Sequence, residues 1–328
     1  MQGGVAMSEY VDSKGNSAKP NGQRRALAIV AALLPIIAAG GIAAWTIATY
    51  GAAQYRALRQ IAENRGDANL VSARTPLGVK WRFLMVDRGT WSLRSGIPLA
   101  ALLIPARSVD LDKRSPAEDI RVLGQLAGLS HLVLMGPRAT CRGMGVLRKL
   151  GGLRSLTILD TRLTNTALGG LPELKRLHKL ILGNDGLDDQ IFSLIATIDN
   201  LRILDLSGNE GVVGAQMERV PRLLELRRLY LVRTHFGDAG LRWAAGLPNL
   251  QYLDLASDEA LRGKGLKSLA AAVRLRNLDL SETGIRDRDL HWIAAIHSLR
   301  VISLKNTRCT STGIAQLRRS DPALQVRY

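Results

Sequence analysis

Aromatic residues, histidines and cysteines are scarce in the 328-residue sequence. Aromatic residues make up only 4% of it, which argues against a nucleic-acid binder built on stacked aromatic platforms. The five histidines are scattered, and the sequence contains no P-loop, no Gly-x-Ser-x-Gly and no zinc-type cysteine pattern. We therefore expect no enzymatic activity, no cofactor and no metal site, and we do not expect nucleic acid as a partner.

What the sequence does contain is a repeat. Segments that open Leu-x-x-Leu/Ile-x-Leu/Ile begin at eight leucines, with a truncated ninth at Leu324: Leu129, Leu153, Leu177, Leu201, Leu226, Leu250, Leu275 and Leu299. Successive starts are 24 or 25 residues apart. A period held over so many units is the signature of a solenoid, because no single unit can bury its apolar side alone.

Each unit has a strand part and a helical part. Positions 1, 4 and 6, counted from the first leucine, are aliphatic in nearly every unit, and the 4/6 alternation is the period of a strand with one buried face. Later apolar positions recur every three residues, as in Leu290, Ile293 and Ile296, which fits a short helix or helical turn. Each unit is therefore predicted to be strand, turn, helix, turn.

Four carboxylates crowd the stretch LDLSETGIRDRDL at residues 278–290: Asp279, Glu282, Asp287 and Asp289. Asp287 precedes the helical part, where a short acceptor side chain serves as an N-cap. Asp289 falls in the first helical turn, where the helix dipole favours a carboxylate. We interpret Glu282 as a solvated turn residue, so that only Asp279 is left to explain.

The repeated pattern Leu-x-x-Leu-x-Leu-x-x-Thr/Asn, followed by Asp/Ser-x-x-Leu/Ile-x-x-Leu/Ile, resembles the leucine-rich repeat family. A clear example is LRNLDLSETGIRDRDLHWIAAIHS at residues 275–298. The resemblance covers residues 107–328. It implies an α/β fold, a right-handed solenoid or horseshoe of about eight repeats, with a parallel sheet on the concave side and helices on the convex side. Pro137, Asp185 and Asp258 replace the family's ladder residue, and the regularity of the ladder stays open there.

One long hydrophobic run lies ahead of the repeats. Residues 26–50 contain no charge, and a helix of 25 residues exceeds the roughly 30 Å hydrocarbon core of a bilayer. Trp45 and Tyr50 suit the membrane interface. We predict an uncleaved transmembrane helix, which makes the lipid bilayer a partner. The alternative is a signal peptide cleaved near residues 51–53.

The segments beside this run differ in composition. Residues 1–25 are rich in Gly, Ser, Asn and Lys, which predicts a disordered polar and basic tail. Residues 51–106 begin with an amphipathic pattern at 52–64, predicted as a short juxtamembrane helix, and the rest is predicted to cap the first edge of the solenoid. The order of segments resembles that of bacterial single-pass membrane-anchored leucine-rich-repeat proteins. Four basic residues precede the run and three follow it, which favours repeats on the non-cytoplasmic side.

The two cysteines, Cys141 and Cys309, lie seven units apart. Strands stack about 4.8 Å apart, so these residues are on the order of 30 Å from one another, whereas a disulfide needs α-carbons within roughly 7 Å. They cannot pair within one chain. We interpret Cys309, at an aliphatic position, as a packing residue, and cysteine usage does not fix the redox compartment.

The formal net charge of +17 is spread along the chain. Much of it falls in or just after the helical part of the units: Arg148, Lys149, Lys175, Arg176, Arg219, Arg222, Lys267, Arg274, Arg318 and Arg319. These residues are either cations at helix ends on a solvated convex face, or a surface that attracts an anionic polymer or membrane surface.

Strand residues at positions 3 and 5 point out of the concave sheet because side chains alternate along a strand. In the later units they form the patch that we predict to bind a protein: Arg228, Tyr230, Tyr252, Asp254, Asn277 and Asp279. Asp254 and Asp279 are expected about 5 Å apart, a repulsive pair. Either the arginines Arg227, Arg276 and Arg300 compensate this pair, or a basic group of the partner does.

The leading hypothesis is a membrane-anchored, single-pass protein whose concave sheet is a non-catalytic protein–protein interaction module. One alternative is a substrate-recognition adaptor of the ubiquitin-ligase or effector type. Another is a binder of anionic polymer or of a membrane surface through the basic convex face. The identity of the partner and the oligomeric state are left open by the sequence.

Overall fold

A computed structural model describes residues 53, 60, 72–74, 80–82, 107–111, 117–126, 128–136, 143–215, 217–221, 223–258, 261 and 263–328. The chain divides into two compact units, Met1–Thr49 and Tyr50–Tyr328, and every described residue belongs to the second. The predicted tail at 1–25 and the predicted transmembrane helix at 26–50 lie outside the described residues. Of the helices within the described ranges, none is long and apolar enough to cross a membrane.

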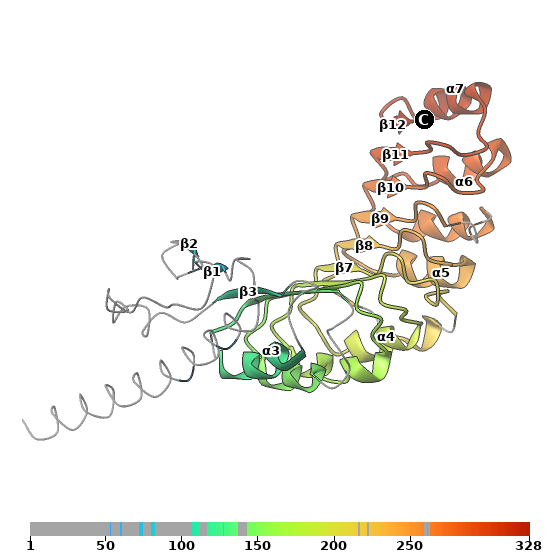
Figure 1. The fold of residues 1–328 in the computed structure, drawn as a ribbon. Coiled ribbons are helices and arrows are strands. Elements are labelled where there is room, and N and C mark those ends of the chain that lie inside the picture. The colour runs from blue at the N-terminus through green and yellow to red at the C-terminus, as the bar shows by residue number, and fades with distance from the viewer. Residues whose placement is uncertain are drawn as a thin grey trace, which may run out of the picture. The chain divides into compact units, whose positions relative to one another are not determined.

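The main feature of the second unit is one parallel sheet of ten strands in sequence order (Figure 1). Its strands are β3 (Ser108–Leu111), β4 (His131–Met135), β5 (Ser155–Leu159), β6 (Lys179–Gly183), β7 (Ile203–Asp205), β8 (Arg228–Tyr230), β9 (Tyr252–Asp254), β10 (Asn277–Asp279), β11 (Val301–Ser303) and β12 (Gln325–Arg327). Each strand pairs with the strand of the next repeat, so the unit is an α/β solenoid. The predicted fold class is confirmed to this extent.

The short helices of the repeats lie on the side opposite the strands (Figure 1). The α-helices are α3 (Ala117–Val122), α4 (Gln190–Ile195), α5 (Asp238–Ala245), α6 (Leu290–Ala294) and α7 (Ser311–Ser320). The 3₁₀ helices are η1 (Leu123–Gln125), η2 (Met144–Lys149), η3 (Asn165–Leu168), η4 (Leu171–Glu173), η5 (Met217–Arg219), η6 (Lys264–Ala271) and η7 (Asp287–Asp289). Three-residue apolar spacing matches the period of a 3₁₀ helix as well as one face of an α-helix, which explains why both types occur.

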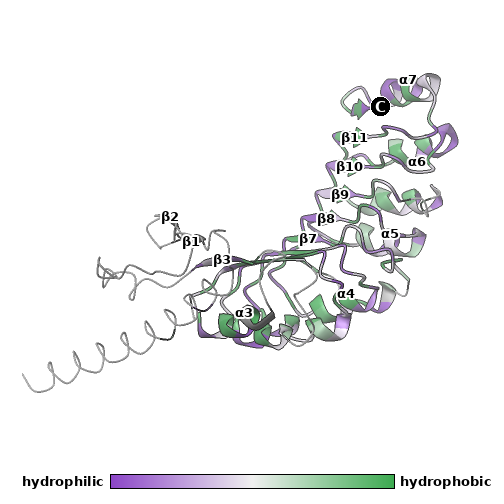
Figure 2. Cartoon of the chain, in the orientation of Figure 1, coloured by the Kyte–Doolittle hydropathy of each residue, from purple (hydrophilic) through white to green (hydrophobic). Residues whose placement is uncertain are grey.

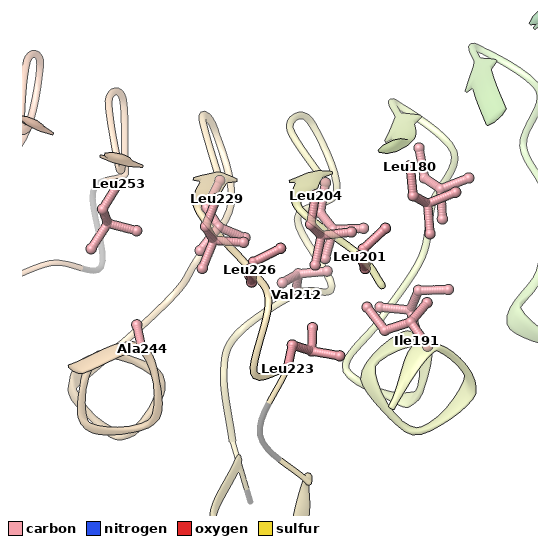
Figure 3. Close-up of a cluster of buried hydrophobic side chains, with 14 of the residues drawn as sticks. Leu180, Ile191, Leu201, Leu204, Val212, Leu223, Leu226, Leu229, Ala244 and Leu253 are labelled. Carbon is pink, nitrogen blue, oxygen red and sulfur yellow. The ribbon is translucent and has the colours of Figure 1, made fainter. Parts of the chain in front are cut away.

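The hydrophobic core fills the space between the sheet and the helices. Leu204, Leu229 and Leu253 have no exposed surface and point from successive strands toward the helical side, where Ile191 and Ala244 face them (Figure 3). Hydrophobic residues recur in the strand and in the helix of each turn of the solenoid (Figure 2). A fully buried leucine contributes roughly 1.5–3 kcal/mol, so these stacked columns hold neighbouring repeats together.

The sheet contains one strand before the first repeat that the sequence reveals. In β3, Val109 and Leu111 pair with Leu132 and Leu134 of β4, so they occupy positions 4 and 6. Position 1 of this unit is Ala106 and not leucine, which hides it from the leucine pattern. At the other end, Ile302 pairs with Val326, so the last spacing is 24 residues and not the 25 that a start at Leu324 implies.

Two strands lie outside the parallel sheet. β1 (Ser72–Arg74) and β2 (Lys80–Arg82) form an antiparallel pair, and β1 contacts β3. Ala53 and Gln60 are helical, and the rest of the segment 52–64, which the sequence predicts as a short helix, lies outside the described residues. Cys309 is half-buried against the core, whereas Cys141 is not among the described residues.

Position 8, in the turn that follows each strand, adopts a left-handed backbone in every unit from β4 to β11. The φ values are 91° at Gly136, 57° at Asp160, 55° at Asn184, 76° at Gly208, 55° at Arg233, 57° at Ser257, 59° at Glu282 and 54° at Asn306. Glycine, asparagine and aspartate tolerate this region, whereas other residues pay roughly 1–2 kcal/mol for it. The turn geometry therefore recurs even where the residue at position 8 disfavours it.

The residues at position 9, next in sequence after the turn residue, form a column of buried polar side chains. Thr161, Asp185, Asn209, Thr234 and Asp258 are each at most 3% exposed. Asp185 Oδ1 accepts hydrogen bonds from Thr161 N (2.9 Å) and Thr161 Oγ1 (2.6 Å), and Asp185 N donates to Asn209 Oδ1 (3.0 Å). Thr234 Oγ1 lies 3.4 Å from Asp258 Oδ2. The ladder thus runs through both aspartates, which answers the question that the sequence left open at Asp185 and Asp258.

One ladder residue is incompletely satisfied. Asp185 Oδ2 is buried and has no hydrogen-bond partner within the described part of the chain. Burial raises the pKa of this carboxyl from 3.8 to about 6, against the two hydrogen bonds from Thr161, which lower it. Asn209, at position 9 of the next unit, has a satisfied side-chain amide, because its Nδ2 donates to Leu182 O and Leu206 O.

Candidate binding face

The alternation of the strands places all six residues of the predicted patch on the open face of the sheet. In β8, β9 and β10 the central leucines, Leu229, Leu253 and Leu278, are at most 2% exposed. The residues on either side of each leucine therefore point away from the core. Arg228 is exposed, and the other five residues of the patch are half-buried.

Two tyrosines pack together at the centre of this face. The rings of Tyr230 and Tyr252 have centroids 5.0 Å apart and are tilted by 38°. Such aromatic pairs add about 0.5–1.5 kcal/mol beyond the area that they bury. The Tyr252 hydroxyl donates to Asp254 Oδ2 at 3.2 Å. Burial and the neighbouring charge of Asp254 raise the pKa of the Tyr252 hydroxyl, which keeps it protonated and able to donate.

Three aspartates surround the tyrosine pair. Asp254 and Asp279 are direct cross-strand partners, as the sequence predicts, and Asp205 pairs with Tyr230 on the other side. Burial raises the pKa of the Asp254 carboxyl above its usual value, and the charges of Asp279 and Asp205 raise it further. Hydrogen bonds from Ala256 N and from the Tyr252 hydroxyl oppose these effects. The face therefore concentrates negative charge around an apolar pair of rings.

Compensation by arginines, one of the two alternatives that the sequence leaves open, is not supported by any close contact among the described residues. No salt bridge joins Asp254 or Asp279 to any described Arg or Lys, and the Arg300 guanidinium donates instead to the carbonyls of Leu299 and His297. Arg227, Arg276 and Arg300 stand at position 2 of their units and the aspartates at position 5, and three residues of strand span about 10 Å. The arginine and aspartate side chains therefore start at opposite ends of the strand, too far apart to form a salt bridge.

Each aspartate is satisfied by its own loop. Asp205 Oδ1 accepts from Ser207 N at 3.0 Å, Asp254 Oδ1 from Ala256 N at 3.1 Å, and Asp279 Oδ1 from Ser281 N at 2.9 Å. This contact of a carboxylate with the backbone two residues on is the Asx turn. It orients the aspartates without neutralising them, so their charge remains available at the surface.

Sequence reasoning missed Asp205 and two serines. The Ser281 hydroxyl donates to Asp279 Oδ1 at 2.6 Å and lies 2.7 Å from Ser303 Oγ. Asp205 lies at position 5, as Asp254 and Asp279 do, and this shared position was the available signal. From here on, the acid–tyrosine patch denotes Asp205, Tyr230, Tyr252, Asp254 and Asp279, with Arg228 and Asn277 at its edge.

Asp287 is not an N-cap of its own helix. The residue that precedes η7 is Arg286, and Asp287 accepts from Thr310 N (2.8 Å) and Thr310 Oγ1 (2.6 Å) of the next repeat. These two bonds lower the pKa of the Asp287 carboxyl. The helical cap there is Thr310, whose hydroxyl accepts from Gly313 N. The N-cap interpretation fails because the carboxylate reaches across to the following unit.

The same contact recurs in two other repeats. Asp189 accepts from the backbone N–H groups of Val213, Gly214 and Ala215 at 2.7–3.0 Å. Asp238 accepts from Gly265 N at 2.9 Å. Position 13 therefore joins consecutive repeats, because its carboxylate at the helix start of one unit accepts hydrogen bonds from backbone N–H groups of the next.

The remaining two carboxylates of the 278–290 stretch are also structural. Asp289 is 6% exposed, and its Oδ2 accepts from Arg286 N at 3.0 Å, at the start of the helical part as predicted. Glu282 is an exposed turn residue, as predicted, and it accepts from the Ser257 hydroxyl at 2.7 Å. Only Asp279 of the four lies on the open face.

The basic residues of the helical side are exposed where they are described. Arg148 and Lys149 end η2 with solvent-facing side chains, and Lys175 and Arg176 are exposed in the loop after η4. Lys175 Nζ donates to Thr197 O at 3.1 Å, a contact with a carbonyl at the end of a helical segment. This arrangement agrees with cations at helix ends.

Comparison with known proteins adds little to this geometry. The chain matches no protein-family model and no curated protein. Among solved structures it is similar to the plant peptide hormone receptor RGFR1 in complex with RGF2, with 17% sequence identity and a TM-score of 0.44. The match covers 67% of this chain and 35% of that chain, so the chain spans about a third of the receptor's length. The parallel sheet and its 23- to 25-residue register establish the solenoid independently of this match.

Proposed function

We propose that the chain is a membrane-anchored leucine-rich-repeat protein whose acid–tyrosine patch binds a basic segment of another protein. The observation that carries this proposal is the tyrosine pair, with tilted rings 5.0 Å apart, beside aspartates that form no salt bridge with a described basic side chain. A binding role also follows from the repeat pattern, since stacked repeats present an extended strand face on which side chains of many units cooperate.

The tyrosines provide the contact area. Tyrosine and arginine are over-represented among the residues that carry most of the binding energy at protein interfaces. Tyr230 and Tyr252 brace one another, and the Tyr252 hydroxyl is held by Asp254, so little side-chain freedom is lost on binding. Arg228 is exposed next to them and adds a further donor.

The aspartates provide the charge preference. The chain carries a formal net charge of +17, so a cluster of three carboxylates is a local exception on a basic protein. Burial and mutual repulsion raise the pKa of Asp254, and a cation at this place relieves both the repulsion and part of the desolvation. A lysine or arginine side chain stacked on a tyrosine face also gains a cation–π interaction.

Selection from a random peptide library tests this preference without knowledge of the partner. The full-length chain in non-ionic detergent serves as bait, beside Asp254→Asn with Asp279→Asn, which keeps side-chain size and removes charge. We expect enriched peptides to contain lysine or arginine and to bind the double variant at least about tenfold more weakly. Enrichment of uncharged or acidic peptides, or equal binding to the variant, contradicts the proposal.

Membrane attachment is the second part of the proposal, and its support is the uncharged run at residues 26–50. The four-to-three excess of basic residues before the run favours a cytoplasmic N-terminus with the repeats on the non-cytoplasmic side. Carbonate extraction of membranes that contain the full-length chain tests the anchor, since an integral protein stays in the pellet. Release of the intact chain into the supernatant contradicts it. Protease accessibility of the repeats in sealed vesicles then tests the orientation.

A further inference from the structure

A second charged feature of the solenoid lies at the other end of the strands. Position 2, just before each strand, is basic in six of the eight units from Leu129 to Leu299: Arg154, His178, Arg202, Arg227, Arg276 and Arg300. Backbone bonds stack this position from unit to unit, as in Arg202 N to His178 O, Arg227 N to Arg202 O and Arg300 N to Arg276 O. Neighbouring strands lie about 4.8 Å apart, so these side chains line one edge of the sheet, the basic edge, which Gln251 interrupts between Arg227 and Arg276.

The basic edge contains a pocket at its C-terminal end. A cavity of about 330 Å³ is lined by Gln251, Val273, Arg274, Arg276, Ser298 and Arg300. This volume is at the lower end of the range of about 300–1,000 Å³ that small-molecule sites occupy. Gln251, Arg276 and Arg300 come from position 2 of three successive repeats, and the other three residues come from the loops that lead into β10 and β11.

No carboxylate lines this pocket, although three guanidinium groups surround it. Arg274 donates to the Asn249 side-chain oxygen, and Arg300 donates to Leu299 O at 2.8 Å. The Arg276 guanidinium has no hydrogen bond or ion pair with any described residue. The three positive charges around the cavity repel one another, and a bound anion replaces this repulsion with a net electrostatic attraction.

We propose that the pocket of Arg274, Arg276 and Arg300 binds a tetrahedral oxyanion, a phosphate or sulfate ester. A guanidinium presents a planar fork of donors that matches two oxygens of such a group, and three guanidinium groups together can contact more of its oxygens than one can. The Gln251 side-chain amide adds a neutral donor at the edge of the pocket.

This site is separate from the acid–tyrosine patch and goes beyond the proposed function. Arg276 and Asp279 belong to the same repeat but stand at opposite ends of β10. Loss of binding at the patch therefore leaves the anion site intact, and the reverse also holds. A single partner can occupy both sites only if it carries both an oxyanion and a basic segment.

Isothermal titration calorimetry of the full-length chain in non-ionic detergent tests the proposal. The probes are inorganic phosphate and inorganic sulfate, titrated at an ionic strength held constant with sodium chloride. We expect saturable binding of at least one of them. Phenyl phosphate and phenyl sulfate, titrated in parallel, show which ester the pocket prefers.

Two triple variants locate the binding. Arg274→Gln with Arg276→Gln and Arg300→Gln removes the pocket charges, and Arg242→Gln with Arg308→Gln and Arg319→Gln removes three exposed charges elsewhere. We expect the pocket variant to bind at least about tenfold more weakly and the control variant to change by less than about twofold. Absence of saturable binding by the wild type, or an equal loss in both variants, overturns the proposal. Thermal melts of both variants check that they fold.

Discussion

The first half of the sheet, β4 to β6, and the second half, β7 to β11, differ in strand length and in the residues at position 5. Strands β4, β5 and β6 run for five residues each, whereas β7 to β11 run for three. At position 5 the first half has Val133, Thr157 and Ile181, and the second half has aspartate at three of five strands. β-branched residues favour the extended backbone, whereas aspartate binds the backbone N–H two residues on and turns the chain.

A strand ended by an aspartate therefore leaves a charge at the surface where a longer strand leaves an aliphatic side chain. The Asx turns at Asp205, Asp254 and Asp279 give this part of the sheet its acidic face, and β8 and β11, which end in Tyr230 and Ser303, are equally short. The position-8 turn differs as well. It uses Gly136, Asp160 and Asn184 in the first half, and Gly208, Arg233, Ser257, Glu282 and Asn306 in the second. Three of these five second-half residues, Arg233, Ser257 and Glu282, adopt a backbone conformation that their side chains disfavour, whereas the first half contains the buried Asp185.

The largest predicted effect concerns that buried carboxyl. The pKa of Asp185 is raised from 3.8 to about 6, so the stability that its protonated form contributes is fully present below pH 3.8 and lost as pH rises through 6. The loss at neutral pH is up to about 3 kcal/mol. We expect Asp185→Asn to be more stable than the wild type by up to that amount at pH 7.5 in urea denaturation, and by little at pH 4.

The exposed carboxylate of Asp199 supplies the control. Asp199→Asn is expected to leave the pH dependence of the wild type unchanged. Equal pH dependence of the wild type and Asp185→Asn between pH 4 and 7.5 contradicts the raised pKa of Asp185.

The second prediction separates binding from stability on the open face. Asp254→Ala with Asp279→Ala is expected to weaken binding of a selected basic peptide by about 2 kcal/mol or more. The free energy of unfolding should change by less than about 1 kcal/mol, because relief of repulsion offsets the lost turn hydrogen bonds. Peptide titration and urea denaturation measure the two quantities.

The matched variant lies in the first half of the sheet. Thr157→Ala with Ile181→Ala changes position 5 of β5 and β6 and is expected to leave peptide affinity unchanged. The proposal is wrong if this variant binds as weakly as the double aspartate variant. Wild-type affinity is also expected to fall at acidic pH, since the basic segment needs ionised carboxylates.

The third prediction concerns the bonds between repeats, which both halves share. Asp189→Ala removes three acceptor contacts to the next repeat and is expected to lower the free energy of unfolding by about 2 kcal/mol. Asp287→Ala removes two contacts at an exposed position and should lower the melting temperature less. Neither should change peptide affinity. A larger loss in Asp287→Ala than in Asp189→Ala is the result that this account does not allow.

The smallest predicted effect concerns the turn after the strand. Arg233 has a φ of 55°, a conformation that costs a residue with a side chain roughly 1–2 kcal/mol. Glycine removes that cost but loses more conformational entropy on folding. We expect Arg233→Gly to stabilise the protein by about 0.5 kcal/mol in urea denaturation. Asp160→Gly, at the same position in the first half, should give no gain, since aspartate already tolerates the turn.

Much of this arrangement could be predicted from the sequence, because the period and the alternation within each strand decide which side chains face out. All six predicted patch residues lie on one face for that reason. The strand β3 was hidden because Ala106 replaces the first leucine. The role of Asp287 was misassigned because its donors are 23 residues away, beyond the reach of local capping rules. The absence of salt bridges between the position-2 arginines and the aspartates was not foreseen. Position along the strand, and not charge alone, decides which groups meet.

The most direct test of the central claim is photo-crosslinking from matched sites in the two halves. Asn277 and Lys179 both stand at position 3, on β10 and β6, and both are half-buried on the open face. A photoreactive residue is placed at one site or the other in the full-length chain, in cells that naturally produce it. We predict a protein adduct from position 277 that Asp254→Ala with Asp279→Ala abolishes, and none from position 179. An adduct from 179 alone, or one from 277 that survives the double substitution, contradicts a binding face in the second half of the sheet.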